Sequence, residues 1–302
     1  MKFHHDDTEE EIGPDSGSGF GGPGFGGLLR SLFSKIPWGE QVSHEESLVV
    51  PSPAGRAINI YNANGKTRVL GEDRDDIEIR VHKSVRADCK DLATKLLDSI
   101  RIQNSATTEI LDIEVQIPRK CSRHAVAHVE ILVPRDTKVS LTSTNGKMCL
   151  EGLERAVHAR SSNGPVLIRN VVGDIDVTTA NAKVKCSDTE GHLRARSSNG
   201  KIEVECHCGS LDASTSNGII RASIDQLDTA GVSLTTTNGR IVLDLPEKTD
   251  ADIDIRVENG HIRNDLELMD QTRENDGRVR GRIGVGGTPI SLRTSNGTVS
   301  LR

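Results

Sequence analysis

The dipeptide Asn-Gly returns at nearly constant spacing along this chain, each time between two short runs in which apolar and polar residues alternate. It stands at eight positions: Asn64, Asn145, Asn163, Asn199, Asn217, Asn238, Asn259 and Asn296. Between Asn145 and Asn217 the step is 18 residues, if Asn181-Ala182 is counted as a copy, and the next two steps are 21 residues. Self-similarity at a fixed period indicates a repeat architecture.

Equal offsets from each asparagine hold residues of the same kind. Three residues after it come Met148, Val166, Val184, Ile202, Ile220, Ile241, Ile262 and Val299. Lys, Arg, Glu, Asp and Ser fill the positions between the apolar residues, so each copy contains two half-buried strands. Asn-Gly supplies the reversal between them, because Gly takes positive φ without steric cost and Asn tolerates it better than most residues.

Two architectures fit such copies. In a single-stranded β-solenoid each copy is one coil, equal positions stack in parallel about 4.8 Å apart, and the asparagines form a ladder along one corner. In a meander, Asn-Gly closes type I′ hairpins and the strands run antiparallel. Only stacked coils explain why equal offsets hold equal residues. We therefore predict an all-β, β-helix-like solenoid with coils of about 18 residues.

Residues 46–140 are expected to extend the stack as less regular coils. Alternating segments such as "RAINIYNANGKTRVLGE" and "DDIEIRVHKSV" read as strands. Leu92, Leu96 and Ile100 instead recur at helical spacing and predict one short helix near 88–98. We therefore assign residues 46–302 to one β-repeat domain.

Residues 1–45 differ in composition and are expected to form a disordered tail. The tail begins with an acidic stretch and continues as a Gly-rich one, and such segments cannot bury enough apolar surface to order themselves. Within it, Leu28–Trp38 reads as a short amphipathic helix. This helix would either touch a membrane surface or a partner, or cap the open end of the solenoid.

Composition limits the kind of partner and the compartment. The net charge is −6 with acids and bases interspersed, and only six of 302 residues are aromatic, so neither a basic face nor base stacking supports nucleic-acid binding. No signal peptide and no run of about 18 apolar residues is visible. Six irregularly spaced cysteines read as reduced thiols. We expect a cytoplasmic protein, with peripheral membrane contact through Leu28–Trp38.

No catalytic or metal-binding constellation emerges. Cys206, His207 and Cys208 are the sharpest cluster, but Cys-x-Cys lacks the usual zinc spacing and a second ligand pair, so most of the cysteines are read as small buried hydrophobes. Asp174, Asp176, Asp188 and Asp212 could in principle form the paired carboxylates of a glycoside hydrolase, although solvated strand faces explain them better. We predict no enzyme activity and no cofactor.

Residues 46–302 resemble a known family. "INIYNANGKTRVLGE", the strand "IEIRVHK", a helix, "EILVPRDTKVSLTSTNGKMCLEGL", tandem "SSNGKIEV" units and a closing "GVGGTPISLRTSNGTVSL" are similar, in this order, to the bacterial β-repeat domain of unknown function called "putative adhesin". The resemblance implies a β-solenoid-like domain associated with the cell envelope or with a stress response. It implies no catalytic residues.

Together these features favour a non-catalytic structural or interaction module that binds a protein partner or another copy of itself. Its flat faces would present Lys147, Lys183, Lys201, Arg160, Arg194, Arg196, Arg240, Glu203 and Asp212. Unpaired solenoid ends need covering, and the segments 28–38 and 296–302 are the candidates. The alternative function is a polysaccharide-binding protein, or a lyase or hydrolase on a β-helix.

Overall fold

The computed structural model describes residues 39–118, 124–274 and 277–302. The tail that was predicted to be disordered, as far as residue 38, and the segment Leu28–Trp38 that was predicted to contact a membrane lie outside the described residues. The β unit starts at Gly39, because strand β1 runs over Glu40–Pro51. The boundary predicted at residue 46 therefore falls inside this strand, and residues 40–45 belong to the β unit rather than to the tail.

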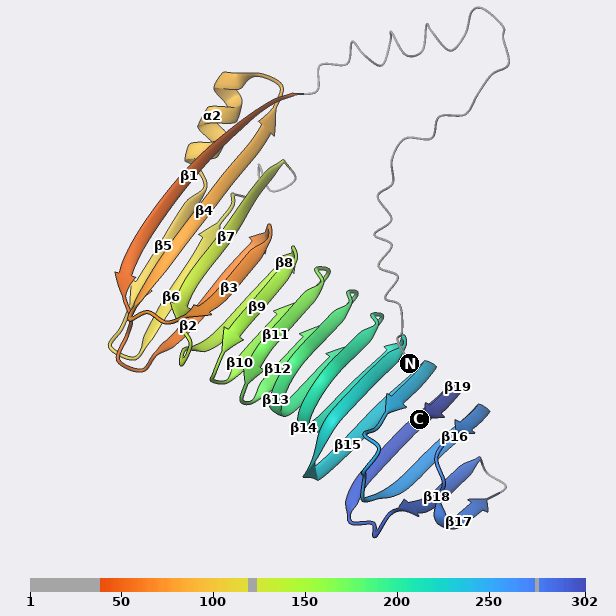
Figure 1. Cartoon of the computed structure of the whole chain (residues 1–302). Coiled ribbons are helices and arrows are strands. Elements are labelled where there is room, and N and C mark those ends of the chain that lie inside the picture. Colours follow the sequence, from red (N-terminus) through yellow and green to blue (C-terminus); the bar gives the residue numbers. More distant parts are fainter. Residues whose placement is uncertain (1–38, 119–123, 275–276) are drawn as a thin grey trace, which may run out of the picture. The chain divides into compact units, whose positions relative to one another are not determined.

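The copies of the repeat stack as coils in parallel register. Their strands are β8 (Lys138–Asn145), β9 (Met148–Leu153), β10 (Val157–Ser161), β11 (Val166–Val172), β12 (Ile175–Thr179), β13 (Val184–Ser197), β14 (Ile202–Asn217) and β15 (Ile220–Asp244). Val157 pairs with Ile175, and Ile175 with Leu193, one period apart each time. The predicted β-solenoid is confirmed, and the antiparallel meander is wrong for these coils (Figure 1).

Aliphatic side chains fill the interior in columns. The column three residues after the corner asparagine includes Met148, Val166, Val184, Ile202, Ile220 and Ile241, all 0% exposed. A second column, Val139, Val157, Ile175, Leu193, Leu211 and Val232, faces it from the other sheet and is at most 2% exposed. Parallel stacking places equivalent residues of neighbouring coils on top of one another. One aliphatic residue per coil is therefore enough to continue each column.

The first coil does not stand at the end of the stack. β2 (Ala57–Asn64) lies between β6 (Ile110–Gln116) and β8, and β3 (Thr67–Glu72) lies between β7 (Ala125–Pro134) and β9, all in parallel. β4 (Asp76–Ala87) runs antiparallel between β1 and β7, and β5 (Arg101–Ala106) is antiparallel to β6. The N-terminal region thus continues the stack only in part, since β1, β4 and β5 turn antiparallel.

The last strand is also inserted. β16 (Ala251–Asn264) is followed by β17 (Met269–Glu274) and β18 (Arg278–Ile283), which pair antiparallel, and β19 (Thr288–Leu301) then pairs in parallel with both β15 and β16. Figure 1 shows β19 between these two strands. The segment 296–302, expected to cover an open end, is therefore an inner strand.

Other elements cover the two ends of the apolar core. Helix α2 (Lys90–Asp98), at the position predicted for the one helix, packs against β1 and β4 through its buried Ala93 and Leu97. At the other end Leu266 and Leu268, which follow the last coil, pack against the core. Within the described residues there is no helix with the length and hydrophobicity that a membrane crossing requires.

Candidate functional site

The corner asparagines form a ladder along the stack. Each Nδ2 donates a hydrogen bond to the Oδ1 of the neighbouring asparagine, at 2.8–3.1 Å, in the order Asn145, Asn163, Asn181, Asn199, Asn217, Asn238, Asn296 and Asn259. Asn64 pairs in register with Asn145, but its Nδ2 donates to the carbonyl oxygen of Ala125 at 3.0 Å. The ladder follows the spatial order of the coils, so the inserted Asn296 stands before Asn259.

In several coils a hydroxyl two residues before the asparagine bonds to the corner backbone, whereas the equivalent hydroxyls of Ser143, Thr179 and Thr294 are buried without a partner among the described residues. Ser161 Oγ accepts a hydrogen bond from the Gly164 amide at 3.0 Å, and Ser197 Oγ accepts one from the Gly200 amide at 2.8 Å. Thr215 Oγ1 donates instead to the carbonyl oxygen of Gly200, in the preceding coil, at 3.2 Å. Sequence reasoning missed this role, although the Ser or Thr at this offset in most copies was a usable signal.

The corner glycine is required by close packing at several positions where φ does not require it. A Cβ on Gly164 would lie 1.8 Å from the carbonyl oxygen of Gly146, and one on Gly239 would lie 1.8 Å from that of Gly218. Only at Gly65, Gly260 and Gly297 is φ in the left-handed region, at 135°, 153° and 155°. The predicted dependence on positive φ therefore holds for these three corners alone.

Several outward charges pair across the coils. Glu203 lies between the ammonium groups of Lys183 and Lys201 and bonds to both. Desolvation of Glu203 raises its pKa, but these two bonds outweigh it and leave the pKa below the ordinary value. In the other sheet, Asp212 lies 3.3 Å from Arg194. These five predicted surface residues are thus paired, although Glu203 is only 8% exposed and so is not the outward residue expected.

A groove of about 490 Å³ lies on the outer side of β1, β4, β7 and β3. Its lining residues are Glu45, Glu46, Ser47, Lys66, Arg68, Arg80, Val81, His82, His128, Val129 and Glu130. The imidazole rings of His82 and His128 stack with centroids 6.2 Å apart. His82 Nδ1 is 3.0 Å from Glu45 Oε1, and His128 Nδ1 accepts a hydrogen bond from the Lys66 amide at 3.0 Å.

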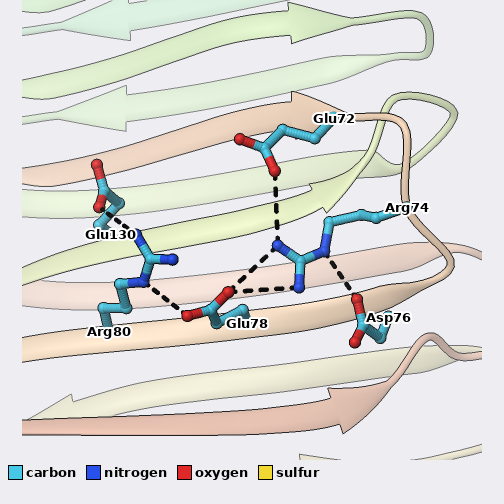
Figure 2. A network of polar contacts seen from close by, with 6 residues as sticks. All are labelled: Glu72, Arg74, Asp76, Glu78, Arg80 and Glu130. Carbon is cyan, nitrogen blue, oxygen red and sulfur yellow. Dashed lines mark hydrogen bonds and ion pairs between the residues drawn. The ribbon is translucent and has the colours of Figure 1, made fainter.

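Two lining residues of this groove, Arg80 and Glu130, belong to an ion-pair network that extends beyond it to Arg74 (Figure 2). Arg80 reaches Glu78 at 2.6 Å and Glu130 at 3.5 Å. Arg74 contacts Glu78 at 3.4 Å and Asp76 at 2.8 Å. The hydrogen bond from Arg80 is the main cause that lowers the pKa of Glu78. These residues were not singled out from the sequence, because β4 and β7 meet only through tertiary pairing.

The groove is nearly balanced in charge. Lys66, Arg68 and Arg80 face the three carboxylates of Glu45, Glu46 and Glu130. The pKa of His128 lies below its ordinary value, mainly because the ring is partly buried. Electrostatic interaction with His82 and then with Lys66 lowers it further. The Lys83 ammonium lies 2.9 Å from Glu46 Oε1. Such a lining can exchange its internal ion pairs for those of a polar ligand.

The three metal candidates do not converge. His207 is 0% exposed, with Nδ1 3.0 Å from Thr189 Oγ1 and Nε2 3.1 Å from the Ser210 carbonyl oxygen. Cys206 is exposed at φ 51°, so it is not the buried hydrophobe expected, and Cys208 is half-buried. Within the described residues no three His, Cys, Asp or Glu side chains are placed to hold a metal ion.

The remaining thiols and carboxylates are scattered. Cys186 is buried as expected, and desolvation raises its pKa to about 12, whereas Cys89 is exposed. Asp176 and Asp212 lie in the sheet that contains β12, whereas Asp188 lies in the N-terminal half of β13, in the opposite sheet. Of the four carboxylates considered for glycoside hydrolysis, Asp188 thus lies in a different sheet from Asp176 and Asp212, and Asp174 directly precedes β12.

A comparison with protein families identifies the family to which this stack of coils belongs. The model of the Toastrack DUF4097 family matches residues 56–302. The chain belongs to the Toastrack family. This agrees with the resemblance to the "putative adhesin" β-repeat domain, and the Toastrack region covers every coil described above.

Solved structures were also compared with the Toastrack chain. It is 10% identical to a putative adhesin from Bacteroides fragilis, covering 86% of this chain and 97% of that one with a TM-score of 0.44. A putative adhesin from Parabacteroides distasonis is 10% identical, with 87% and 98% covered and a TM-score of 0.37. A putative cell adhesion protein from Clostridium sporogenes is 10% identical, with 86% and 99% covered and a TM-score of 0.30. No curated protein matches the chain.

Proposed function

We propose that this Toastrack domain is a non-catalytic interaction module that binds a polar, extended segment of a protein partner in the groove over β1, β4, β7 and β3. The groove carries this proposal, because it is concave, mixed in charge and built on rigid strands. Ion pairs that stay exposed to water contribute little stability, so exchanging them for those of a partner costs little.

The edge of the sheet supports the same function. Among the described strands, β1 pairs with β4 alone, which leaves its other edge open beside the groove. Leu48 and Val49 on β1 are 42% and 56% exposed. An open edge strand is a template for an added strand from another chain, and such added strands gain affinity from main-chain hydrogen bonds. The added strand comes from a different protein or from a second copy of this chain.

The setting we propose is a reducing, cytoplasmic one. The exposed thiols of Cys89 and Cys206 are free, and free surface thiols are typical of reducing compartments. The alternative of a lyase or hydrolase is less well supported, because glycoside hydrolysis needs two carboxylates across one cleft. Asp188 lies in a different sheet from Asp176 and Asp212, and Asp212 is paired with Arg194.

Site-specific photocrosslinking in cells tests the groove. A photoreactive phenylalanine at Ser47, beside the groove, is expected to capture one discrete protein, whereas the same probe at Thr178, on the opposite sheet, is not. Arg80→Glu should abolish the Ser47 product, because it reverses a charge in the lining. Equal products at both positions, or a Ser47 product that survives Arg80→Glu, would contradict the proposal.

A further inference from the structure

We propose that the corner of the stack is a second binding site, which takes an extended carboxylated polysaccharide along the axis of the coils. The site consists of the asparagine ladder and of the basic row, defined as the residues two positions after each corner asparagine. It goes beyond the protein-binding function of the groove, with which it shares Lys66 alone of its charged residues.

The basic row is continuous because main-chain hydrogen bonds join its members from coil to coil. The carbonyl oxygen of Lys147 accepts from the Thr67 amide, that of Lys183 from Val166, and that of Lys201 from Val184, each at 2.9 Å. In spatial order the row contains Lys66, Lys147, Pro165, Lys183, Lys201, Ile219, Arg240, Thr298 and His261, with the charged lysines and arginine in its first seven positions. None of these residues is acidic.

The row carries a net positive charge. Lys66, Lys147 and Arg240 are exposed, and no ion pair joins them to an acid of the described residues. Glu203 bonds to both Lys183 and Lys201, which leaves one net charge on that trio. About four positive charges thus lie along about 30 Å, at about 4.8 Å per coil. An extended polymer with regularly spaced carboxylates is complementary to such a line.

The ladder provides the neutral half of the site. Each inner asparagine uses one Nδ2 hydrogen and one Oδ1 lone pair within the ladder, so its second hydrogen and second lone pair face solvent. Ser162, Ser198 and Ser216, beside the ladder, are exposed as well. Amides and hydroxyls that both donate and accept match sugar hydroxyls, and the coil spacing is close to the length of one pyranose unit in an extended chain.

The same surface disfavours nucleic acid. Single-stranded nucleic acid is held by base stacking on aromatic rings. Tyr61 is the only Phe, Tyr or Trp after residue 38, and it lies on β2 rather than on the corner. A carbohydrate with carboxylates therefore fits the corner better than a polynucleotide.

Biolayer interferometry on the full chain tests this site, with immobilised polygalacturonate as the probe and dextran, polyphosphate and single-stranded DNA as comparisons. We expect saturable binding to polygalacturonate that weakens as salt is raised, and none to dextran. The pair Lys147→Ala and Arg240→Ala should weaken it about tenfold. The matched pair Arg160→Ala and Arg196→Ala removes the same formal charge from the sheet that contains β10 and β12. This pair should change the affinity for polygalacturonate less than about twofold.

Two further variants make the outcome decisive. Asn181→Ala with Asn199→Ala should also weaken binding with no change in charge, provided that the circular dichroism spectrum shows a folded chain. Arg80→Glu, in the groove, should leave polygalacturonate binding unchanged. The proposed protein-binding role of the groove and the proposed polysaccharide-binding role of the corner can therefore be refuted independently of each other. The proposal would be overturned if the Lys147/Arg240 pair and the Arg160/Arg196 pair weakened binding equally. It would also be overturned if the chain did not bind polygalacturonate, or if it bound polyphosphate or DNA as tightly.

Discussion

At the scale of single residues, each glycine corner combines a weak interaction with a close steric approach, whereas the corner at Asn181 has Ala182 in place of glycine. An exposed amide hydrogen bond of the ladder exchanges with bonds to water, so each contributes about 1 kcal/mol or less. The glycine beside it is less replaceable, because a carbonyl oxygen of the adjacent coil, that of Gly146 for Gly164, lies where its Cβ would be. The register of the coils therefore depends more on the steric exclusion of a side chain at the corner glycine than on the hydrogen bonds of the ladder.

Replacing this glycine should expose that requirement. Gly164→Ala is expected to lower the free energy of unfolding by about 2 kcal/mol or more, because the new methyl group must displace the Gly146 carbonyl oxygen. Ala182→Gly, at the equivalent corner of the next coil, should cost only about 0.5–1 kcal/mol through chain entropy. Urea unfolding followed by circular dichroism measures both. Equal losses would show that the close approach is not what requires glycine.

At the scale of elements, a strand's position in the stack matters more than its position in the sequence. β19 is the last strand of the chain, yet it pairs in parallel with β15 and β16 and carries the buried Ile290, Leu292, Val299 and Leu301. β17 precedes it, pairs only with β18 among the described strands and is exposed throughout. Burial on both sides makes the C-terminal strand part of the core.

Truncations in the two strands should differ accordingly. Leu292→Ala in β19 removes a side chain that is 0% exposed and should cost about 2–5 kcal/mol. Met269→Ala in β17 removes one that is 57% exposed and should cost less than about 0.5 kcal/mol. The midpoints of thermal unfolding compare them. A similar shift in both variants would place β17 in the core or β19 outside it.

At the scale of the whole β unit, the coils do not follow chain order at either end. The first coil, β2 and β3, is enclosed by residues 110–153, and the last, β19, is enclosed by β15 and β16. Each end therefore closes through contacts between residues far apart in sequence. In such an array each coil depends on its neighbours, so the loss of one coil should spread only outward from it.

Removing residues 288–302 tests this dependence. Without β19, the parallel partner of β16 is gone, so amide protection against hydrogen exchange should fall across 251–283 as well as at the cut. The inner coils from β8 to β14 should keep their protection, because their neighbours remain. Hydrogen exchange followed by mass spectrometry locates the loss. Loss of protection throughout the β unit would show instead that it unfolds as a single cooperative unit.

The candidate sites were predictable to different degrees. The basic row could be read from the sequence in part, since Lys147, Lys183, Lys201 and Arg240 share one offset from the asparagine. The groove could not, because His82 and His128 belong to an antiparallel pair whose register no repeat marks. Cys206 was misplaced for a related reason. It lies at a bend with φ 51°, which turns its side chain outward against the alternation.

The sequence alone determined the coil: its period, its parallel register, its aliphatic columns and its corner. These features are local and repeated, so each copy confirms the others and a single pattern specifies them all. The tertiary structure alone decided which coils are neighbours at the two ends, where the groove forms, and that the final strand lies inside. Those outcomes depend on pairing between distant, non-repeated strands, and such pairing is selected by the packing energy of the whole unit, which has no signature in any one segment.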